Sequence, residues 1–294
     1  MPSRIDFFME KFKDRLYQYW LLARFDKPIG ILILLWPTLW ALWIASNGKP
    51  DLLVLTVFVS GVVLMRAAGC VINDYADKDF DPHVDRCKLR PIAAGKVTSK
   101  EALIVFVVLC LTAFSLVLLM NWYTIALSFI GAFLAASYPF MKRFTHLPQA
   151  YLGAAFGFAV PMAFAAQTNE IPMVGWLLYL AVLLWALVYD TMYAMVDIED
   201  DLKIGVKSTA ILFGKRVREI TAGLQIVILG LLVTVGQMQQ LAWPYYAGLL
   251  VGAGLFLYQQ QLIFHFHKPD CFKAFLNANW FGLAIFIGLL AAYL

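Results

Sequence analysis

The chain has 294 residues, of which 62% are hydrophobic and only 14% are charged, and its net charge is +4. Soluble proteins average about 25% charged residues, and a soluble chain of this length could not bury so much apolar surface. The composition therefore excludes an ordinary soluble domain and predicts a protein that has the lipid bilayer as its solvent.

The first element in the chain is a charged segment, residues 1–27, without the apolar stretch of a cleaved signal peptide. Its apolar side chains recur at helical spacing, at Ile5, Phe8, Phe12, Leu16 and Tyr19. This spacing predicts an amphipathic helix that lies on the membrane surface, and a frayed basic tail is the alternative.

Nine apolar runs follow, each close to the length of about 20 residues that crosses a bilayer as a helix. Every run has to be helical, because a strand exposed to lipid would leave backbone groups without hydrogen bonds. The sequence thus predicts an all-α, polytopic membrane protein with a single domain over residues 1–294. The predicted spans are residues 28–46, 52–74, 103–120, 123–141, 148–167, 172–196, 219–236, 243–264 and 276–294.

The distribution of basic residues predicts how these spans are oriented. All 23 Lys and Arg residues except Lys49 and Arg66 fall in the N-terminal segment or in loops that nine spans would place on the same side. Loops rich in Lys and Arg stay in the cytoplasm. We therefore expect a cytoplasmic N-terminus, a C-terminus on the far side and an odd number of spans.

Two clusters of carboxylates follow the second and the sixth span. Asn73, Asp77 and Asp81 are spaced at intervals of four residues, so a helix that continued through them would present all three on one face. Asp197 and Asp201 repeat this interval, each 120 residues after its counterpart. The common offset indicates two related halves, with one cluster at an equivalent helix end in each half.

The type and spacing of these side chains predict a metal site. Carboxylates on one helix face repel one another, so a positive partner must offset them. Mg²⁺ prefers oxygen ligands and is usually held by one or two carboxylates together with substrate phosphates. Two facing clusters would therefore bind Mg²⁺ and a diphosphate. The alternative is that both clusters are solvated loop charges that cap helix ends.

Basic side chains that could bind phosphate oxygens lie beside both clusters, at Arg86, Lys88, Arg90, Lys203 and Lys207. Each one alone is also explained by the ordinary excess of basic residues in cytoplasmic loops. Arg66 differs because it lies within a predicted span, seven residues before Asn73 and on the same helix face. A charge inside the membrane costs several kcal/mol unless it faces a cavity or a partner, so we expect Arg66 to line a substrate cavity. Snorkelling or a structural ion pair is the alternative.

Further segments, together with the two carboxylate clusters, resemble the membrane-embedded aromatic prenyltransferases, and within them the bacterial branch that uses 4-hydroxybenzoate. The likeness runs from about residue 20 to the C-terminus. The segments that resemble this branch are Arg24 to Gly30, Met65 to Cys70, Tyr138 to Arg143, His146 to Gln149 and Lys207 to Gly214. Asp79 and Asp85 are extra carboxylates that the family pattern does not require.

This resemblance implies nine helices around a central cavity that opens sideways to lipid. It implies that the two clusters bind Mg²⁺ and diphosphate through Asn73, Asp77, Asp81, Asp197 and Asp201. It also implies diphosphate contacts from Arg24 and Lys142, with Tyr138 beside them. Completing the predicted site are Arg66 as a catalytic residue and Lys88, Arg90, Arg143 and Lys207 as substrate-binding residues.

The resemblance implies an enzyme that transfers a polyprenyl group from polyprenyl diphosphate to the ring carbon ortho to the hydroxyl of 4-hydroxybenzoate, in ubiquinone biosynthesis. Its expected location is the bacterial inner membrane, with the site loops on the cytoplasmic side and no nucleic-acid partner. Protein partners cannot be assigned from the sequence. The rival acceptors are dihydroxynaphthoate, homogentisate and haem or chlorophyll precursors. A cation-coupled transporter is less favoured, because transporters place ionisable groups near the bilayer midplane.

Overall fold

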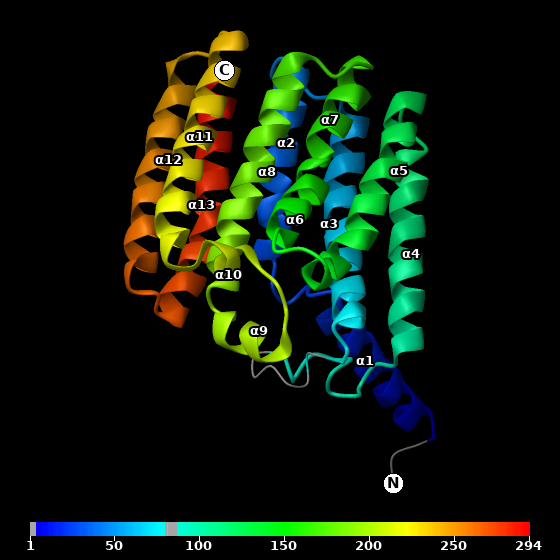
Figure 1. Ribbon diagram of the computed structural model, residues 1–294. Coiled ribbons are helices and arrows are strands. Elements are labelled where there is room, and N and C mark those ends of the chain that lie inside the picture. Colours follow the sequence, from blue (N-terminus) through cyan, green and yellow to red (C-terminus); the bar gives the residue numbers. More distant parts are fainter. Residues whose placement is uncertain (1–3, 80, 82–86) are drawn as a thin grey trace.

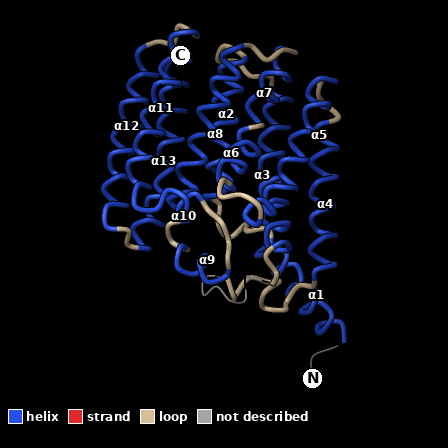
Figure 2. The backbone as a smooth tube through the Cα atoms, in the orientation of Figure 1, coloured by secondary structure: helices blue, strands red, loops and turns tan. Residues whose placement is uncertain are grey.

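The computed structural model describes residues 4–79, 81 and 87–294, and Figure 1 shows long helices standing side by side. Among these residues, every regular element is a helix and there is no strand, as the tube in Figure 2 also shows. Asp85 and Arg86 lie outside the described residues. The N-terminal helix and α9 lie at one end of the bundle, and the C-terminus lies at the opposite end.

The prediction of about nine spanning helices is confirmed. In the described part of the chain, eight helical stretches are long and apolar enough to cross a membrane, and α2 is a shorter apolar helix of 17 residues. The spanning helices are α2 (Ile29–Ala45), α3 (Leu52–Ala76), α4 (Ser99–Val117), α5 (Trp122–Ser137), α6 (Pro148–Gly157) with α7 (Ala159–Thr168), α8 (Met173–Ala194), α11 (Val217–Met238), α12 (Trp243–Leu262) and α13 (Lys268–Ala292).

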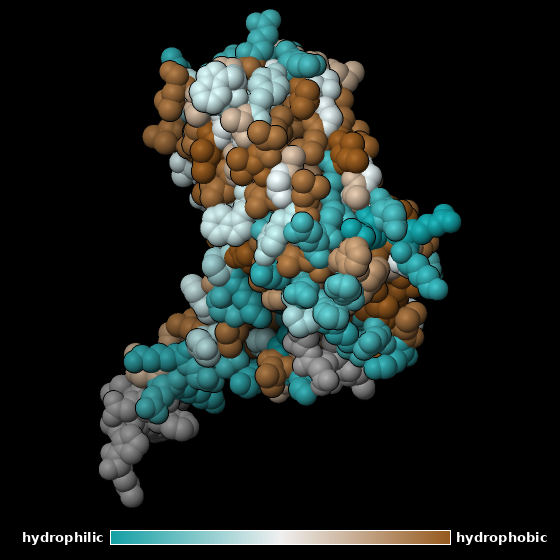
Figure 3. Space-filling model, turned by 90° about the vertical axis from the view of Figure 1, so that its left-hand side faces the viewer, coloured by the Kyte–Doolittle hydropathy of each residue, from teal (hydrophilic) through white to brown (hydrophobic). Residues whose placement is uncertain are grey.

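Short helices connect these spans at the end of the bundle where α3 and α8 finish. They are the 3₁₀ helix η2 (Tyr138–Arg143), α9 (Ile198–Ile204), α10 (Thr209–Phe213), and the 3₁₀ helices η3 (Gly214–Arg216) and η4 (Ile263–His265). A side view shows hydrophilic side chains over the lower part of the molecule, beside the N-terminal helix, and a mostly hydrophobic upper part (Figure 3).

The fifth and the last span differ most from the sequence prediction. The fifth span is broken between α6 and α7, because Pro161 has no N–H to donate to the carbonyl of Gly157 and so ends the hydrogen-bond ladder there. The last span begins at Lys268 rather than at residue 276. Its first turns carry Lys268 and Asp270, so apolar composition marks only the later part of the helix.

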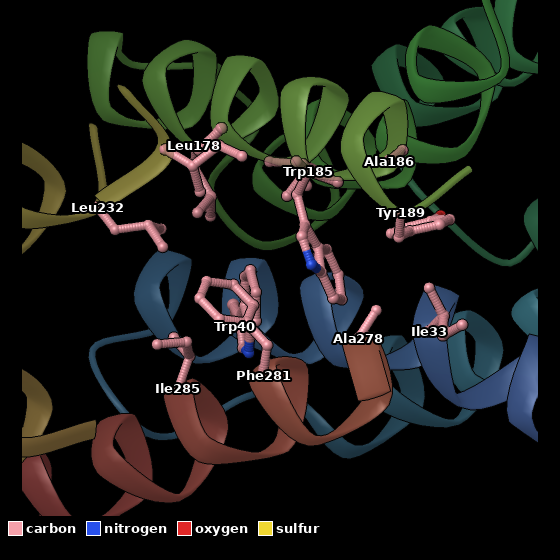
Figure 4. Close-up of a cluster of buried hydrophobic side chains, with 14 of the residues drawn as sticks. Ile33, Trp40, Leu178, Trp185, Ala186, Tyr189, Leu232, Ala278, Phe281 and Ile285 are labelled. Atoms are coloured by element: carbon pink, nitrogen blue, oxygen red, sulfur yellow. The ribbon is translucent and has the colours of Figure 1, made fainter. Parts of the chain in front are cut away.

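Aromatic side chains join α2, α8 and α13 at the centre of the bundle (Figure 4). The ring centroid of Trp185 lies 5.5 Å from that of Trp40 and 5.5 Å from that of Phe281. Phe256 of α12 stacks on Phe281 with centroids 4.1 Å apart. Aromatic pairs add about 0.5–1.5 kcal/mol each beyond their buried area, so this cluster fixes how the three helices pack.

The N-terminal helix α1 (Arg4–Leu22) packs against α3 and the start of α4. Tyr19 Oη donates to Glu101 Oε1 at 3.0 Å, and Leu22 is fully buried. The apolar face predicted from the sequence is therefore wrong at Tyr19, which is turned toward α4. From Met9 onward, where side chains of α1 are described, Phe12 and Leu16 of the predicted face are exposed, as are Met9, Tyr17 and Trp20.

Candidate active site

A polar cavity of about 190 Å³ lies where α3 and α8 end, under the short helices. Both carboxylate clusters contribute to its wall, so the structure brings together residues that are 120 positions apart. The lining residues are Asn73, Asp77, Asp81, Cys87, Arg90, Tyr138, Pro139, Lys142, Pro148, Gln149, Leu152, Asp190, Tyr193, Ala194, Asp197, Asp201, Ile204, Val206, Lys207 and Ser208.

The first cluster keeps helical spacing beyond the end of its helix. The regular part of α3 ends at Ala76, so the continuing helix expected from the sequence is wrong there. Nevertheless, the N–H of Asp77 donates to the carbonyl of Asn73 at 2.9 Å, and that of Asp81 donates to Asp77 at 2.8 Å. These two bonds preserve the four-residue interval, and all three side chains reach the cavity.

The second cluster spans the junction of α8 and α9. Asp197 occupies the N-terminal cap position of α9, and the N–H of Asp201 donates to its carbonyl at 2.8 Å. Both side chains line the polar cavity, as does Asp190 in the last turn of α8. Each cluster thus begins at the end of a long spanning helix and continues with helical backbone hydrogen bonds.

Basic side chains offset two carboxylates of the first cluster directly. Lys142 Nζ lies 2.6 Å from Asp77 Oδ2, and Arg90 Nη1 lies 2.8 Å from Asp81 Oδ2. Both carboxylates are buried, at 3% and 5% exposure. Burial raises the pKa of Asp81 above its ordinary value, and the guanidinium of Arg90 opposes this effect.

Asp74 is a site residue that sequence reasoning missed. It is 1% exposed and accepts hydrogen bonds from Arg24 Nη2 at 2.6 Å and from Arg90 Nη1 at 3.2 Å. Burial opposes the charge of Arg24, but the carboxylate of Asp74 outweighs it and raises the pKa of Arg24. The available signal was its place directly after Asn73. That place turns it about 100° from the predicted face, toward Arg24.

Tyr138 connects the polar cavity with an apolar one. Its hydroxyl donates to Asn73 Oδ1 at 3.3 Å, and Asn73 Nδ2 donates to Asp77 Oδ2 at 3.2 Å. Tyr138 also lines an apolar cavity of about 200 Å³ between α2, α3, α4, α5, α6 and α7. The other residues of that wall are almost all apolar, among them Val57, Gly61, Met65, Phe114, Gly131 and Phe156.

Four predicted site residues do not line the polar cavity. Arg24 reaches the cluster only through Asp74, Lys88 is exposed, and Arg143 Nη2 donates to the carbonyl of Ala76. Arg66 is half-buried. Its guanidinium contacts Cys70 Sγ, and an ideal Cβ on Gly30 would lie 2.5 Å from its Nη2. Among the described residues, Arg66 makes no ion pair with a carboxylate.

The cavity side chains suit a hard divalent cation by their chemistry. Asn73 and the four predicted aspartates offer only oxygen ligands, and Asp77 Oδ1 is buried without a hydrogen-bond partner in the described part of the chain. The described residues do not, however, bring three or more His, Cys, Asp or Glu side chains close enough to hold an ion. In this arrangement Lys142 and Arg90 balance the charge of the first cluster.

Comparisons with known proteins agree with this arrangement. Residues 34–288 match the UbiA prenyltransferase family. A 4-hydroxybenzoate octaprenyltransferase of Methylococcus capsulatus is 68% identical over 282 residues, which cover 96% of this chain and 97% of that relative. The enzyme of the same name from Nitrosococcus oceani is 61% identical, with coverage of 96% and 99%.

Solved structures share the fold. The apo structure of a UbiA homolog from Aeropyrum pernix K1 superposes with a TM-score of 0.79 at 25% identity, covering 90% of this chain and 98% of the homolog. A UbiA homolog from Archaeoglobus fulgidus bound to GPP and Mg²⁺ superposes with a TM-score of 0.67 at 18% identity, covering 92% and 99%. The family match over most of the chain and these close relatives show that the protein belongs to the UbiA prenyltransferase family.

Proposed function

We propose that the protein transfers a polyprenyl group from polyprenyl diphosphate to the ring carbon ortho to the hydroxyl of 4-hydroxybenzoate, in ubiquinone biosynthesis. The observation that carries the proposal is the meeting of a polar and an apolar cavity at Tyr138. A substrate with a charged head and a long apolar tail fits such a pair of cavities. Relatives named 4-hydroxybenzoate octaprenyltransferase, at up to 68% identity, support the choice of acceptor.

The diphosphate binds in the polar cavity in this proposal. Lys142, Lys207 and Arg90 line it and supply donors for phosphate oxygens. Arg24 and Arg90 both contact Asp74, so Arg24 adds positive charge close to Arg90. Of the other predicted binding residues, Lys88 follows the first cluster at the surface, and we assign it a phosphate-steering role.

Asn73, Asp77, Asp81, Asp197 and Asp201 are the residues we propose to hold Mg²⁺. A bound ion would supply Lewis-acid stabilisation of the departing diphosphate. The Archaeoglobus homolog bound to GPP and Mg²⁺ supports this choice of metal. Lys142 and Arg90, which contact Asp77 and Asp81, lie where they could also donate to the diphosphate oxygens.

The chemical step takes place beside Tyr138. The bond between the allylic carbon and the diphosphate oxygen breaks, and its electron pair leaves with the diphosphate. The electron-rich ring carbon of the acceptor then attacks the allylic carbon, and loss of the ring proton restores aromaticity. The aromatic face of Tyr138 and the apolar wall exclude water from the cation and stabilise it. We assign the acceptor carboxylate to the positive charges of Arg66 and Arg143.

We propose that the end of the bundle with the polar cavity faces the cytoplasm of a bacterium and that the helices cross its inner membrane. The distribution of Lys and Arg supports this orientation. The position of α1 and α9 at one end of the bundle, opposite the C-terminus, agrees with it.

The test is an assay of membranes that contain the protein, with 4-hydroxybenzoate, a polyprenyl diphosphate and Mg²⁺, in which the prenylated ring product is measured. Dihydroxynaphthoate and homogentisate serve as competing acceptors in parallel reactions. The proposal requires product with 4-hydroxybenzoate and its loss when EDTA removes the metal. Product with a different acceptor alone would refute the assigned acceptor, and no product with any acceptor would refute the prenyl transfer.

A further inference from the structure

Gln149 lies in the wall of the polar cavity, outside both carboxylate clusters. It is the second residue of α6, and its side chain is 7% exposed. Its side-chain oxygen accepts a hydrogen bond from the backbone N–H of Thr209 at 2.9 Å. A buried amide that lines a cavity, and whose oxygen is already hydrogen-bonded, is a candidate for binding the ligand of that cavity.

The bond to Thr209 fixes which way the amide points. A backbone N–H can only donate, so the atom that faces it has to be the oxygen Oε1 of Gln149. A flipped amide would place two donors against each other in a buried place. The nitrogen Nε2 of Gln149 is therefore the amide atom that does not face the N–H of Thr209. It makes no hydrogen bond to any of the residues that the structure describes.

Thr209 is itself held in place by a chain of buried hydrogen bonds. Thr191 Oγ1 donates to the carbonyl of Leu187 at 2.6 Å, which uses the only proton of that hydroxyl. Thr209 Oγ1, 2.7 Å from Thr191 Oγ1, must then be the donor of that pair. Thr191 and Thr209 are both fully buried. Gln149 is thus anchored through Thr209 to α8, the helix that ends at the second cluster.

The polar cavity is lined by both carboxylates and basic side chains, and one of the basic residues belongs to the segment that Gln149 contacts. Lys207 and Ser208, which precede Thr209, line the same cavity, and so does Lys142. The N–H of Lys207 donates to the carbonyl of Lys142 at 3.1 Å, which holds these two basic residues on one side. Pro148 also lines the cavity, so α6 begins at its wall with the positive end of its dipole.

We infer that Gln149 is a substrate-binding residue, with its Nε2–H₂ group donating to an anionic oxygen of a substrate in the polar cavity. This inference deepens the proposed function and rests on it. The oxygen belongs either to the diphosphate or to the carboxylate of the aromatic acceptor. Both are anionic oxygens that accept hydrogen bonds, and binding measurements with each ligand distinguish between them.

The sharpest variant is Gln149→Glu. The carboxylate keeps an acceptor for Thr209 N–H, so the anchor and the fold are retained, while the donor toward the cavity is replaced by a negative charge. Gln149→Leu removes the acceptor as well, so it shows the effect of losing the hydrogen bond to Thr209 on stability and binding. Gln237→Glu, at an exposed position near the end of α11, is the matched control for the change of charge.

The measurement is thermal stabilisation of the purified full-length protein by Mg²⁺ with inorganic pyrophosphate, and separately by 4-hydroxybenzoate. Wild type, Gln149→Glu and Gln237→Glu are compared without need of turnover. We expect Gln149→Glu to weaken the binding of one of the two ligands by about tenfold or more, since a hydrogen bond to a charged group is lost. Weakened pyrophosphate binding assigns the diphosphate, and weakened 4-hydroxybenzoate binding assigns the carboxylate.

In the membrane assay, the KM of the substrate whose binding is weakened must rise, and the KM of the other substrate must stay near its wild-type value. If Gln149→Glu melts at the wild-type temperature and binds both ligands like Gln237→Glu, the inference is overturned, whatever its activity. Failure of the proposed function looks different, because the wild-type protein itself would then form no prenylated product.

Discussion

At the scale of single residues, carboxylates that are close in sequence have different partners and different roles in the site. Asp77 and Asp81 face the polar cavity, whereas Asp74 is turned toward Arg24 and Arg90. Asp79, in the same segment, is exposed. These four positions therefore allow a site carboxylate, an anchoring carboxylate and a solvated carboxylate to be compared within eight residues of the chain.

Replacing Asp77 by Asn should lower the rate of prenyl transfer by about 100-fold or more, because a proposed metal ligand loses its charge while its shape is kept. Lys142, 2.6 Å away, would then have no carboxylate to offset. The rate is measured in membranes at saturating Mg²⁺, with Asp79→Asn as the control. Full activity in a folded Asp77→Asn protein would remove Asp77 from the metal site.

Replacing Asp74 by Ala should destabilise the protein by about 2 kcal/mol or more, because Arg24, whose side chain is only 18% exposed, loses its partner. Arg90 retains Asp81 and is affected less. Thermal unfolding in detergent measures the effect, and Asp79→Ala is the matched control at an exposed carboxylate. Equal melting temperatures for the two variants would contradict the anchoring role of Asp74.

At the scale of elements, apolar composition predicted the spans well because the bilayer demands about 20 apolar residues from each one. It could not predict α9 and α10, which are too short to show a periodicity. Nor could it show the break at Pro161 or the early start of α13. The break depends on the loss of a backbone hydrogen bond, and the early start depends on a helix that extends beyond the apolar region. Neither of these changes the average hydrophobicity of the segment.

The carboxylate clusters were predictable for a related reason. Intervals of four residues report one helix face even where the regular helix ends, since the backbone bonds of Asp77 and Asp81 continue. The partners of the carboxylates were not predictable, because Arg90, Lys142 and Arg24 come from three separate segments. Which basic residue meets which carboxylate is decided by packing between elements, and the placement of Arg66 away from the polar cavity has the same origin.

The start of α4 carries a capping box, and Glu101 of this box also accepts a hydrogen bond from Tyr19 of α1. Thr98 Oγ1 accepts from Glu101 N–H at 3.2 Å, and Glu101 Oε2 accepts from Thr98 N–H at 2.8 Å. Thr98→Ala should therefore lower stability by about 1 kcal/mol. Ser99→Ala, one residue later and outside the box, is the control in the same unfolding experiment. A Thr98→Ala protein as stable as this control would show that the cap contributes nothing.

At the scale of the whole molecule, the apolar cavity between α2 and α7 offers room for a hydrocarbon chain. Gly61 lines it, and a Cβ at that position would meet nothing within 4 Å. Gly61→Phe should place a ring in the cavity, with no clash at its Cβ, and reduce turnover of a long polyprenyl diphosphate much more than turnover of geranyl diphosphate. The ratio of the two rates is the measurement.

Gly254 provides the matched control for this change. It lies on α12, is exposed, and likewise has no neighbour within 4 Å of an added Cβ. Gly254→Phe should leave the ratio of rates at its wild-type value. If Gly61→Phe also leaves the ratio unchanged, the apolar cavity does not hold the prenyl chain.

Because Tyr138 lies in the wall of both cavities, a bound donor would have its head in the polar cavity and its tail among apolar side chains. Such a substrate reaches the protein by lateral diffusion in the bilayer. The rate of the reaction therefore depends on its surface concentration, in molecules per unit area. Adding inert lipid at fixed amounts of enzyme and donor should therefore slow the reaction, as in surface dilution. The concentration of the small aromatic acceptor in the bulk water would be unaffected, so only one of the two substrates would become scarce.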